Sequence, residues 1–468
     1  MVFSSHVFVF YFLPILLLVY YNLPYRWRNA FLALMSYVFY GWWKPWFATL
    51  MLATTVVNFV CGRIIAAPGA GRGRRVAAVA AGCAASLGLL AFFKYALFAV
   101  GSLNRLLAVF GAEALPVLRV TLPIGISFFT FQAISYTVDV YRGRAAPARS
   151  FVDFACFVSM FPQLIAGPIL RYHTVAEQLL DRRHTPARFS AGAAIFILGF
   201  AKKVLLANPM GEVADAVFAA AAPGAADAWF GVLAYAFQIY FDFCGYSDMA
   251  VGLGRMLGFE FPRNFNAPYL AESITDLWRR WHVSLSTFLR DYLYIPLGGN
   301  RRGAGRTYVN LGVVMLLGGL WHGAKWTFVA WGAYHGLLLA LERWRGKRSV
   351  YAALPRPARV ALTFLLMLLS WVLFRAEDLA DAGRYFAALA GLAETTGASV
   401  LLAAELYTIR NLVLLAVCAA VTIQPVQAFD FSRGRMTLPR AAILLALFAV
   451  ALAVMSAQAF NPFLYFQF

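Results

Sequence analysis

Apolar stretches long enough to enter a lipid bilayer recur along the whole 468-residue chain. A spanning helix needs about 20 such residues. The chain is 62% hydrophobic and 13% charged, whereas soluble domains are about 45–50% apolar and 25% charged. The clearest stretches are Val7–Tyr21, Phe31–Trp43, Val76–Val100, Ala191–Phe200, Val360–Phe374, Leu412–Ile423 and Ala441–Met455. The sequence therefore predicts an all-α polytopic membrane protein with roughly 11 or 12 crossings, in which residues 1–468 form a single membrane domain.

The basic residues lie in short loops between the apolar stretches. The formal net charge is +19, which in a soluble protein would suggest nucleic acid as a partner. Clusters of basic residues between membrane spans instead mark cytoplasmic loops. Membrane topology explains most of these arginines, although a basic loop surface also attracts phosphates. We expect no nucleic-acid partner. The clusters are Arg63, Arg72, Arg74 and Arg75; Arg171, Arg182, Arg183 and Arg188; and Arg301, Arg302 and Arg306.

The charges near both ends of the chain predict where its termini lie. Arg26 and Arg28 follow the first apolar stretch and nothing basic precedes it, so the N-terminus should face outward. That stretch lacks a cleavage site and is interpreted as a retained helix. Three arginines in residues 433–440 precede the last stretch, so residues 461–468 should also emerge outside. Two outward termini require an even number of crossings, which favours 12.

The five cysteines lie far apart in apolar surroundings. They have neither metal-ligand spacing nor the pattern of a disulfide framework. We interpret Cys61, Cys83, Cys156, Cys244 and Cys418 as core residues and expect no metal site.

Residues 273–292 have the pattern of an amphipathic helix. Ser273-Ile-Thr-Asp276 fits a capping box. Apolar residues then fall on one helical stripe, and arginines lie off it. This predicts an interfacial helix on the cytoplasmic side that does not span the membrane. His282 lies at the edge of the stripe, where it either faces a cavity or is an ordinary interfacial histidine.

His322 lies at a break between two apolar stretches, 309–320 and 326–341, each short for a full span. Gly318, Gly319 and Gly323 surround this break, and irregular backbone at membrane depth is tolerated where it lines an enclosed cavity. A titratable group at that depth is costly, which makes His322 a candidate functional residue. The alternative is a histidine bonded to a neighbouring helix. His335, further along the second stretch, fits a structural role.

Two carboxylates, Asp242 and Asp248, share another apolar segment with Tyr246 and Ser247. These side chains should turn inward, away from lipid. Asp242 and Tyr246 are one helical turn apart, so a structural hydrogen bond between them is the alternative. Gln163 lies between two prolines in Phe161–Pro168, which points to a shaped kink more than to chemistry.

Taken together, these segments resemble the membrane-bound O-acyltransferase family, and within it the branch that O-acetylates alginate. Trp278-Arg-Arg-Trp-His282 followed by Leu320-Trp-His-Gly323 is highly specific. The motif core spans about residues 122–336. The C-terminal helix and tail, about residues 440–468, also resemble this family. The matching blocks are Leu122–Gln132, Phe161–Pro168, Asp242–Gly258, Phe265–Tyr269, Trp278–Arg290, Tyr294–Asn300 and Gly319–Gly336.

The resemblance implies a bundle with short re-entrant or amphipathic helices around a central tunnel, whose two funnels meet at a narrow waist. The family's signature histidines correspond to His282, on the cytoplasmic side, and His322, at the waist, and both are expected to be catalytic. Implied tunnel or substrate-binding residues are Trp321, Trp278, Trp281, Asp242, Tyr246, Ser247, Asp248, Gln163 and Asn300. The implied location is the bacterial inner membrane.

The implied reaction moves an acetyl group from a cytoplasmic thioester, acetyl-CoA, to a sugar hydroxyl outside the membrane. Coenzyme A is too polar to cross, so the tunnel would admit only its thioester end, and no permanently bound cofactor is expected. His322 would take the hydroxyl proton and return it to the thiolate, and burial favours the neutral imidazole that this needs. The Trp321 indole N–H would stabilise the oxyanion. His282 would position the thioester or assist at the inner mouth of the tunnel.

The tail Phe463–Phe468 resembles aromatic tails thought to receive the acyl group, which makes Tyr465 a candidate acceptor. A periplasmic acetyltransferase of the SGNH type would then carry acetyl to the exported polysaccharide. The alternative role for the tail is an aromatic anchor at the membrane interface.

The identity of the polymer and the class of protein each have alternatives. Alginate is the first candidate, with cellulose and peptidoglycan as the others. The competing class is a non-enzymatic transporter or channel for the polysaccharide. A transporter predicts matching broken helices in two halves of the chain, whereas the strong motifs here lie only in its central part.

Overall fold

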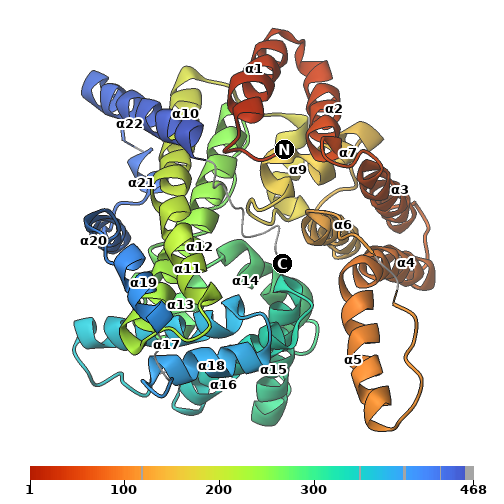
Figure 1. The fold of residues 1–468 in the computed structure, drawn as a ribbon. Helices are drawn as coiled ribbons and strands as arrows, with labels where there is room; N and C mark the ends of the chain where they lie inside the picture. The colour runs from red at the N-terminus through yellow and green to blue at the C-terminus, as the bar shows by residue number, and fades with distance from the viewer. Residues whose placement is uncertain (118–119, 347–348, 394–396, 433, 459–468) are drawn as a thin grey trace. The chain divides into compact units, whose positions relative to one another are not determined.

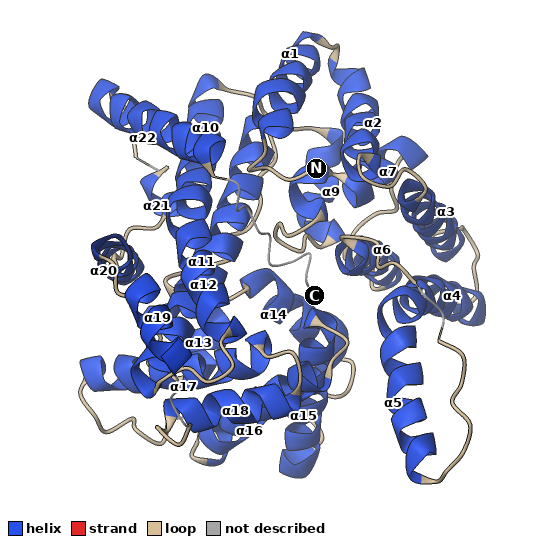
Figure 2. Ribbon diagram, in the orientation of Figure 1, coloured by secondary structure: helices blue, strands red, loops and turns tan. Residues whose placement is uncertain are grey.

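The computed structural model describes residues 1–117, 120–346, 349–393, 397–432 and 434–458. In these ranges the chain forms helices joined by loops, with no strand (Figure 2). The prediction of an all-α protein is confirmed.

The chain folds as two compact units. Unit 1 comprises Met1–Phe189 and Leu253–Pro262, and unit 2 comprises Ser190–Gly252 and Arg263–Phe468. Two helices belong to both units, because α10 (Pro186–Ala201) begins in unit 1 and α12 (Ala225–Met256) ends there. That the whole chain acts as a single membrane domain stays a prediction.

Unit 1 is organised around buried aromatic rings from its first helices. Phe8, Phe12 and Phe39 each contact Phe161, with ring centroids 6.2, 5.3 and 5.4 Å from it. The α-helices are α1 (Leu13–Asn22), α2 (Arg28–Gly41), α3 (Phe47–Ile65), α4 (Arg72–Leu90), α5 (Ala96–Val109), α6 (Ile126–Tyr141), α7 (Phe151–Ser159), α8 (Phe161–Leu164) and α9 (Tyr172–Leu180), with π segments at Val7–Phe12 and Ala91–Tyr95 and a 3-10 turn at Tyr25–Trp27.

Unit 2 contains all the segments that carry the histidine motifs. Its remaining helices are α11 (Asn208–Ala219), α13 (Ile274–Arg280), α14 (Val283–Leu289), α15 (Gly303–His322), α16 (Trp326–Trp344), α17 (Arg356–Arg375), α18 (Leu379–Leu389), α19 (Gly397–Leu406), α20 (Ile409–Ile423), α21 (Ala428–Phe431) and α22 (Leu438–Ala457), with π segments at Lys202–Ala207 and Arg290–Tyr294 and a 3-10 turn at Pro268–Leu270.

Five helical stretches of the described chain are long and apolar enough to cross a membrane. They are Phe47–Ile65, Arg72–Val109, Pro186–Ala219, Arg356–Arg375 and Leu438–Ala457, and Val7–Asn22 and Ile409–Ile423 are shorter apolar helices. The protein is therefore polytopic. Twelve crossings and two outward termini stay predictions.

Helices α15 and α16 lie side by side and are joined by the short turn Gly323–Lys325 (Figure 1). A Cβ atom added at Gly319 would overlap the Phe328 carbonyl oxygen, and one at Gly332 would overlap the Met315 carbonyl oxygen. Small residues at such contacts let helix backbones approach closely. With 20 and 19 residues, both helices extend beyond the apolar stretches in the sequence and approach the length of a full span.

This contact predicts that Gly319→Ala destabilises the protein by about 1–3 kcal/mol, because the added methyl group forces two packed backbones apart. Gly312→Ala is the matched control in the same helix, since a Cβ there meets no atom within 4 Å. The measurement is the thermal unfolding midpoint in detergent. A Gly319→Ala variant that unfolds at the same temperature as the Gly312→Ala variant would contradict the close packing.

Candidate active site

The helix predicted over 273–292 is broken next to His282. Helix α13 ends at Arg280 and α14 begins at Val283. His282 lies between them in the left-handed region, with φ of 45°. Such backbone costs about 1–3 kcal/mol for a residue other than glycine and persists only where surrounding contacts hold it. The prediction of one continuous amphipathic helix is therefore wrong.

An earlier loop holds this break in place. The Val283 N–H donates to the Asn264 carbonyl oxygen at 2.9 Å, and the Asn266 N–H donates to the Arg280 carbonyl oxygen at 2.9 Å. The Asn264 side-chain oxygen also accepts the Ser284 N–H at 3.1 Å and the Ser284 hydroxyl at 2.9 Å. Asn264 thus caps the start of α14, a position where the local sequence supplies no cap.

His282 is only 1% exposed and is surrounded by aromatic rings. Its ring centroid lies 4.6 Å from that of Phe243, 5.8 Å from Trp321 and 6.5 Å from His322. Neither ring nitrogen has a hydrogen-bond partner among the described residues. His282 lies outside the candidate membrane-spanning helices. Burial lowers the pKa of its imidazole to about 3. The imidazole is therefore neutral at physiological pH.

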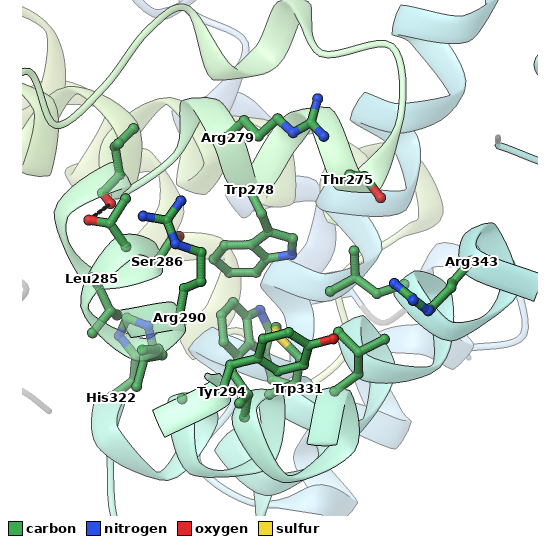
Figure 3. A pocket seen from close by; sticks show the side chains of 18 of the residues that line it. Thr275, Trp278, Arg279, Leu285, Ser286, Arg290, Tyr294, His322, Trp331 and Arg343 are labelled. Atoms are coloured by element: carbon green, nitrogen blue, oxygen red, sulfur yellow. Dashed lines mark hydrogen bonds between the residues drawn. The ribbon is translucent and has the colours of Figure 1, made fainter. Parts of the chain in front are cut away.

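His322 ends α15 and forms part of the wall of a cavity of about 540 Å³ within unit 2. The other walls come from earlier residues of α15, from α13, α14 and α16, from the π segment Arg290–Tyr294 and from Asn300. Figure 3 shows the aromatic side chains of Trp278, Trp331 and Tyr294 in the cavity, with His322 at one side. His322 itself is 6% exposed, and its ring lies 5.2 Å from Trp331 and 5.1 Å from Phe374.

Three arginines surround this cavity. Arg279, Arg290 and Arg343 all line it (Figure 3). Arg290 is partly neutralised, since its Nε donates to the Asp291 carboxylate at 2.8 Å. Arg279 and Arg343 have no ion pair with any described residue. The cavity thus combines apolar walls with positive charge, which suits a slender ligand that carries anionic groups.

Comparison with known proteins identifies the family. Residues 145–361 match the model of the membrane-bound O-acyltransferase family. The chain is 45% identical to a probable alginate O-acetylase AlgI of Azotobacter vinelandii across the full length of both proteins. It is 50% identical to the protein of that name in Pseudomonas syringae pv. tomato, over 83% of this chain and 75% of the relative. A peptidoglycan O-acetyltransferase of Helicobacter pylori is 36% identical over 84% of this chain and 80% of its own length.

The chain belongs to the membrane-bound O-acyltransferase family. It is therefore a multi-pass membrane enzyme, an O-acyltransferase, and the predicted resemblance is confirmed. The alternative class, a non-enzymatic transporter, is not supported.

The structure brings several of the predicted site residues of this acyltransferase together. Trp278, Asn300 and His322 all line the cavity, and Asn300 accepts a hydrogen bond from the Tyr294 hydroxyl. The Trp321 ring lies 5.1 Å from His322. Trp281 is buried in the neighbouring aromatic cluster, 5.1 Å from Trp371.

Gln163 lies elsewhere, in α8 of unit 1. It is fully buried, and its side-chain amide donates to the Phe157 carbonyl oxygen at 2.5 Å. This bond fits the structural kink that the sequence predicts.

The acidic residues of α12 form ion pairs with two lysines. Lys203 pairs with Asp242 at 2.6 Å, with both side chains at most 3% exposed, and Lys202 pairs with Asp248 at 2.7 Å. Close contact between α10 and α12 supports these pairs, because a Cβ at Gly199 would overlap the Gly245 carbonyl oxygen. Tyr246 and Ser247 are buried in the same helix. A tunnel role for these four α12 residues stays a prediction. Two lysines in an apolar helix, matched by two acids in another, were a signal that sequence reasoning missed.

Sequence reasoning also missed Glu342, a buried carboxylate near the end of α16. Its two oxygens accept the Ile274 N–H at 2.8 Å, the Thr275 N–H at 2.9 Å and the Thr275 hydroxyl at 2.6 Å. These N–H groups belong to the first turn of α13 and have no partner within the helix. A carboxylate at a helix N-terminus also interacts favourably with the helix dipole. Glu342 therefore fixes α13, and with it Trp278, against α16.

Glu342→Ala should destabilise the protein by about 2 kcal/mol or more, because it leaves several buried donors without an acceptor. Glu342→Gln retains one acceptor oxygen and should unfold at an intermediate temperature. Thermal unfolding followed by tryptophan fluorescence measures both variants. An Ala variant as stable as the parent would show that this contact does not hold α13.

Proposed function

We propose that this enzyme takes acetyl groups from acetyl-CoA and serves the O-acetylation of an exported polysaccharide of the alginate type in the bacterial inner membrane. The observation that carries the proposal is the position of His322 in the wall of a cavity surrounded by arginines. The relatives named as alginate O-acetylases, at 45% and 50% identity, support the polymer class.

The cavity suits the proposed donor in size and charge. About 540 Å³ falls within the usual range of small-molecule sites. Arg279 and Arg343 would bind the phosphates of coenzyme A, because guanidinium groups form strong charge-assisted bonds with phosphate oxygens. The thioester would then extend between the apolar walls toward His322.

His322 would act as the general base. Its imidazole takes the proton from the acceptor hydroxyl while the hydroxyl oxygen attacks the thioester carbonyl carbon. The tetrahedral intermediate collapses as the carbon–sulfur bond breaks, and the imidazolium returns its proton to the thiolate. The products are an acetyl ester and the free thiol, so no other reactant is needed.

His282 would position the thioester or assist at the inner mouth of the tunnel. Burial lowers the pKa of His282 to about 3, so its imidazole is neutral when the donor binds. The ring centroids of His282 and His322 lie 6.5 Å apart, and the Trp321 ring contacts both imidazoles. We propose that His282 shapes the pocket for the acetyl group and that Trp321 supplies an N–H to the oxyanion.

His322→Ala should lower acetyl transfer by about 100- to 10,000-fold, the usual contribution of a general base. The measurement is turnover of labelled acetyl-CoA by purified enzyme, together with ester-bound acetate on polysaccharide from cells. His6→Ala, an exposed histidine in unit 1, is the matched control. Turnover by His322→Ala at the parent rate would overturn the proposed role.

The immediate acceptor in this proposal is Tyr465, which lies outside the described residues. Its support is the aromatic tail sequence and the resemblance to tails that receive acyl groups. A periplasmic partner acetyltransferase of the SGNH type would carry the acetyl group from Tyr465 to the polysaccharide.

Tyr465→Phe removes the only atom that could carry an acetyl ester in this side chain and keeps its aromatic ring. If Tyr465 is the carrier, polysaccharide acetylation in cells should fall to background. Phe466→Leu, which leaves the Tyr465 hydroxyl in place, should retain acetylation. Full acetylation by the Tyr465→Phe variant would instead support the interfacial anchor.

Peptidoglycan is the second candidate substrate, supported by the 36% identical Helicobacter pylori relative. The same chemistry serves both polymers, because each offers sugar hydroxyls outside the membrane. Ester-bound acetate measured separately on peptidoglycan and on exported polysaccharide, with and without the gene, distinguishes them.

A further inference from the structure

A second cavity, of about 400 Å³, lies within unit 2 and shares no lining residue with the cavity beside His322. It is bounded by α10 and the π segment that follows it, by α12, α20 and α21, and by α22. Helices α10 and α22 belong to candidate membrane-spanning stretches, and α20 is a shorter apolar helix, so this second cavity lies at membrane depth. Its apolar lining includes Leu198, Leu205, Val417, Val421 and Leu447.

Polar groups in the lining of this second cavity are bonded within the protein. The Lys202 ammonium pairs with the Asp248 carboxylate at 2.7 Å. The Tyr240 hydroxyl donates to the side-chain oxygen of Gln427 at 3.3 Å, and the Gln427 amide donates to the Gln424 carbonyl oxygen at 2.9 Å. A buried water needs about two to four polar partners, and unfilled space forfeits the dispersion contacts of the side chains around it. Hydrocarbon is therefore the occupant that suits these walls.

The second cavity opens on an apolar outer surface of unit 2. Val417 and Val426 line it and are exposed side chains. Ile423, in α20, and Leu445, in α22, are exposed as well. Exposed apolar residues on membrane-spanning helices face the acyl chains of the bilayer. A lipid chain can therefore enter the cavity directly from the membrane.

Positive charge gathers at one edge of the second cavity. The Arg440 guanidinium lies 5.0 Å from the ring centroid of Phe431, which lines the cavity. Arg440 donates to the Arg435 carbonyl oxygen at 3.3 Å, and neither arginine forms an ion pair with a carboxylate in the described part of the chain. The acid next to Phe431 in the chain, Asp430, is already paired with Arg263. This edge therefore carries surplus positive charge.

The arginine and the apolar walls are spaced as the two parts of a phospholipid are. Arg440 lies in the first turn of the spanning helix α22, which places it at a membrane interface. Leu447 lies seven residues further along, roughly 10 Å deeper in the membrane. A lipid bound here would have its phosphate at the interface and its chain in the bilayer core. Basic pockets between membrane helices bind anionic headgroups in this way.

We propose that the second cavity binds an anionic phospholipid, with one acyl chain between α10, α20 and α22 and the headgroup phosphate bound by Arg440. The surplus positive charge selects an anionic headgroup, and the apolar walls select a lipid over a free anion. The bound chain also fills the space beside α22, whose Phe448 ring packs 5.4 Å from that of Phe200. This site is separate from acetyl transfer and does not depend on the identity of the acyl donor.

The test measures lipid binding to the purified full-length enzyme in neutral detergent by native mass spectrometry. The ligands are dioleoyl phosphatidylglycerol, which is anionic, dioleoyl phosphatidylcholine, which has no net charge, and inorganic phosphate as the free anion. Leu447→Trp fills the cavity, and Leu445→Trp, at an exposed position of the same helix, is its matched control. Arg440→Gln removes the positive charge and Arg440→Lys retains it. Arg301→Gln, at an exposed position outside the cavity lining, controls for net charge.

Leu447→Trp should weaken binding of the tightest phosphatidylglycerol about 10-fold or more, because the indole occupies the space of the chain. Leu445→Trp should bind this lipid as the parent does. Arg440→Gln should bind phosphatidylglycerol about 5-fold more weakly, the usual contribution of one arginine near a membrane surface, and phosphatidylcholine as the parent does. Arg440→Lys and Arg301→Gln should keep the parent's preference for phosphatidylglycerol.

Equal affinity of the parent and Leu447→Trp for phosphatidylglycerol would overturn the inference, because the lipid would then bind elsewhere. Equal affinity of the parent for the two lipids, or an equal loss in Arg440→Gln and Arg301→Gln, would overturn the headgroup site at Arg440. Binding of inorganic phosphate that is lost in Arg440→Gln and unchanged in Leu447→Trp would make the ligand a free anion and overturn the lipid site. Each of these results leaves the proposed function standing.

Discussion

The close packing of α15 on α16 determines the positions of most groups around His322. Gly319 and Gly332 allow each backbone to touch the other, and no side chain larger than hydrogen fits at these contacts. His322 ends the first helix, while Trp331, His335 and Glu342 all belong to the second. Glu342 then fixes α13 and its Trp278. The shape of the cavity therefore depends on the α15–α16 pair and on the short helix α13 attached to α16.

Part of the cavity lining could be predicted from the sequence, because its residues lie in short, ordered motifs, while their chemical roles stay predictions. His322, Trp278 and Asn300 were expected to share a site, and all three line one cavity. The helical class followed from the apolar stretches, since a membrane offers backbone groups no other partners.

The break at His282 could not be predicted, because the apolar stripe continues through it without interruption. The left-handed backbone there depends on Asn264, which approaches from a separate loop and caps α14. Contacts of that kind are set by tertiary structure. The ion pairs of α12 and the bond to Glu342 were missed for the same reason, since they depend on which helices are neighbours and in what register.

The charge pairs between the π segment Lys202–Ala207 and α12 have a consequence for how the chain is made. A lone lysine or aspartate at the centre of an inserting helix costs about 2.5–3.5 kcal/mol. The Lys202–Asp248 and Lys203–Asp242 pairs remove much of that cost only when both helices are present. The segment that carries the lysines precedes α12 in the chain, so its lysines have no acidic partner until α12 has been synthesised. We therefore infer that the lysine-bearing stretch is stably placed only once α12 packs against it.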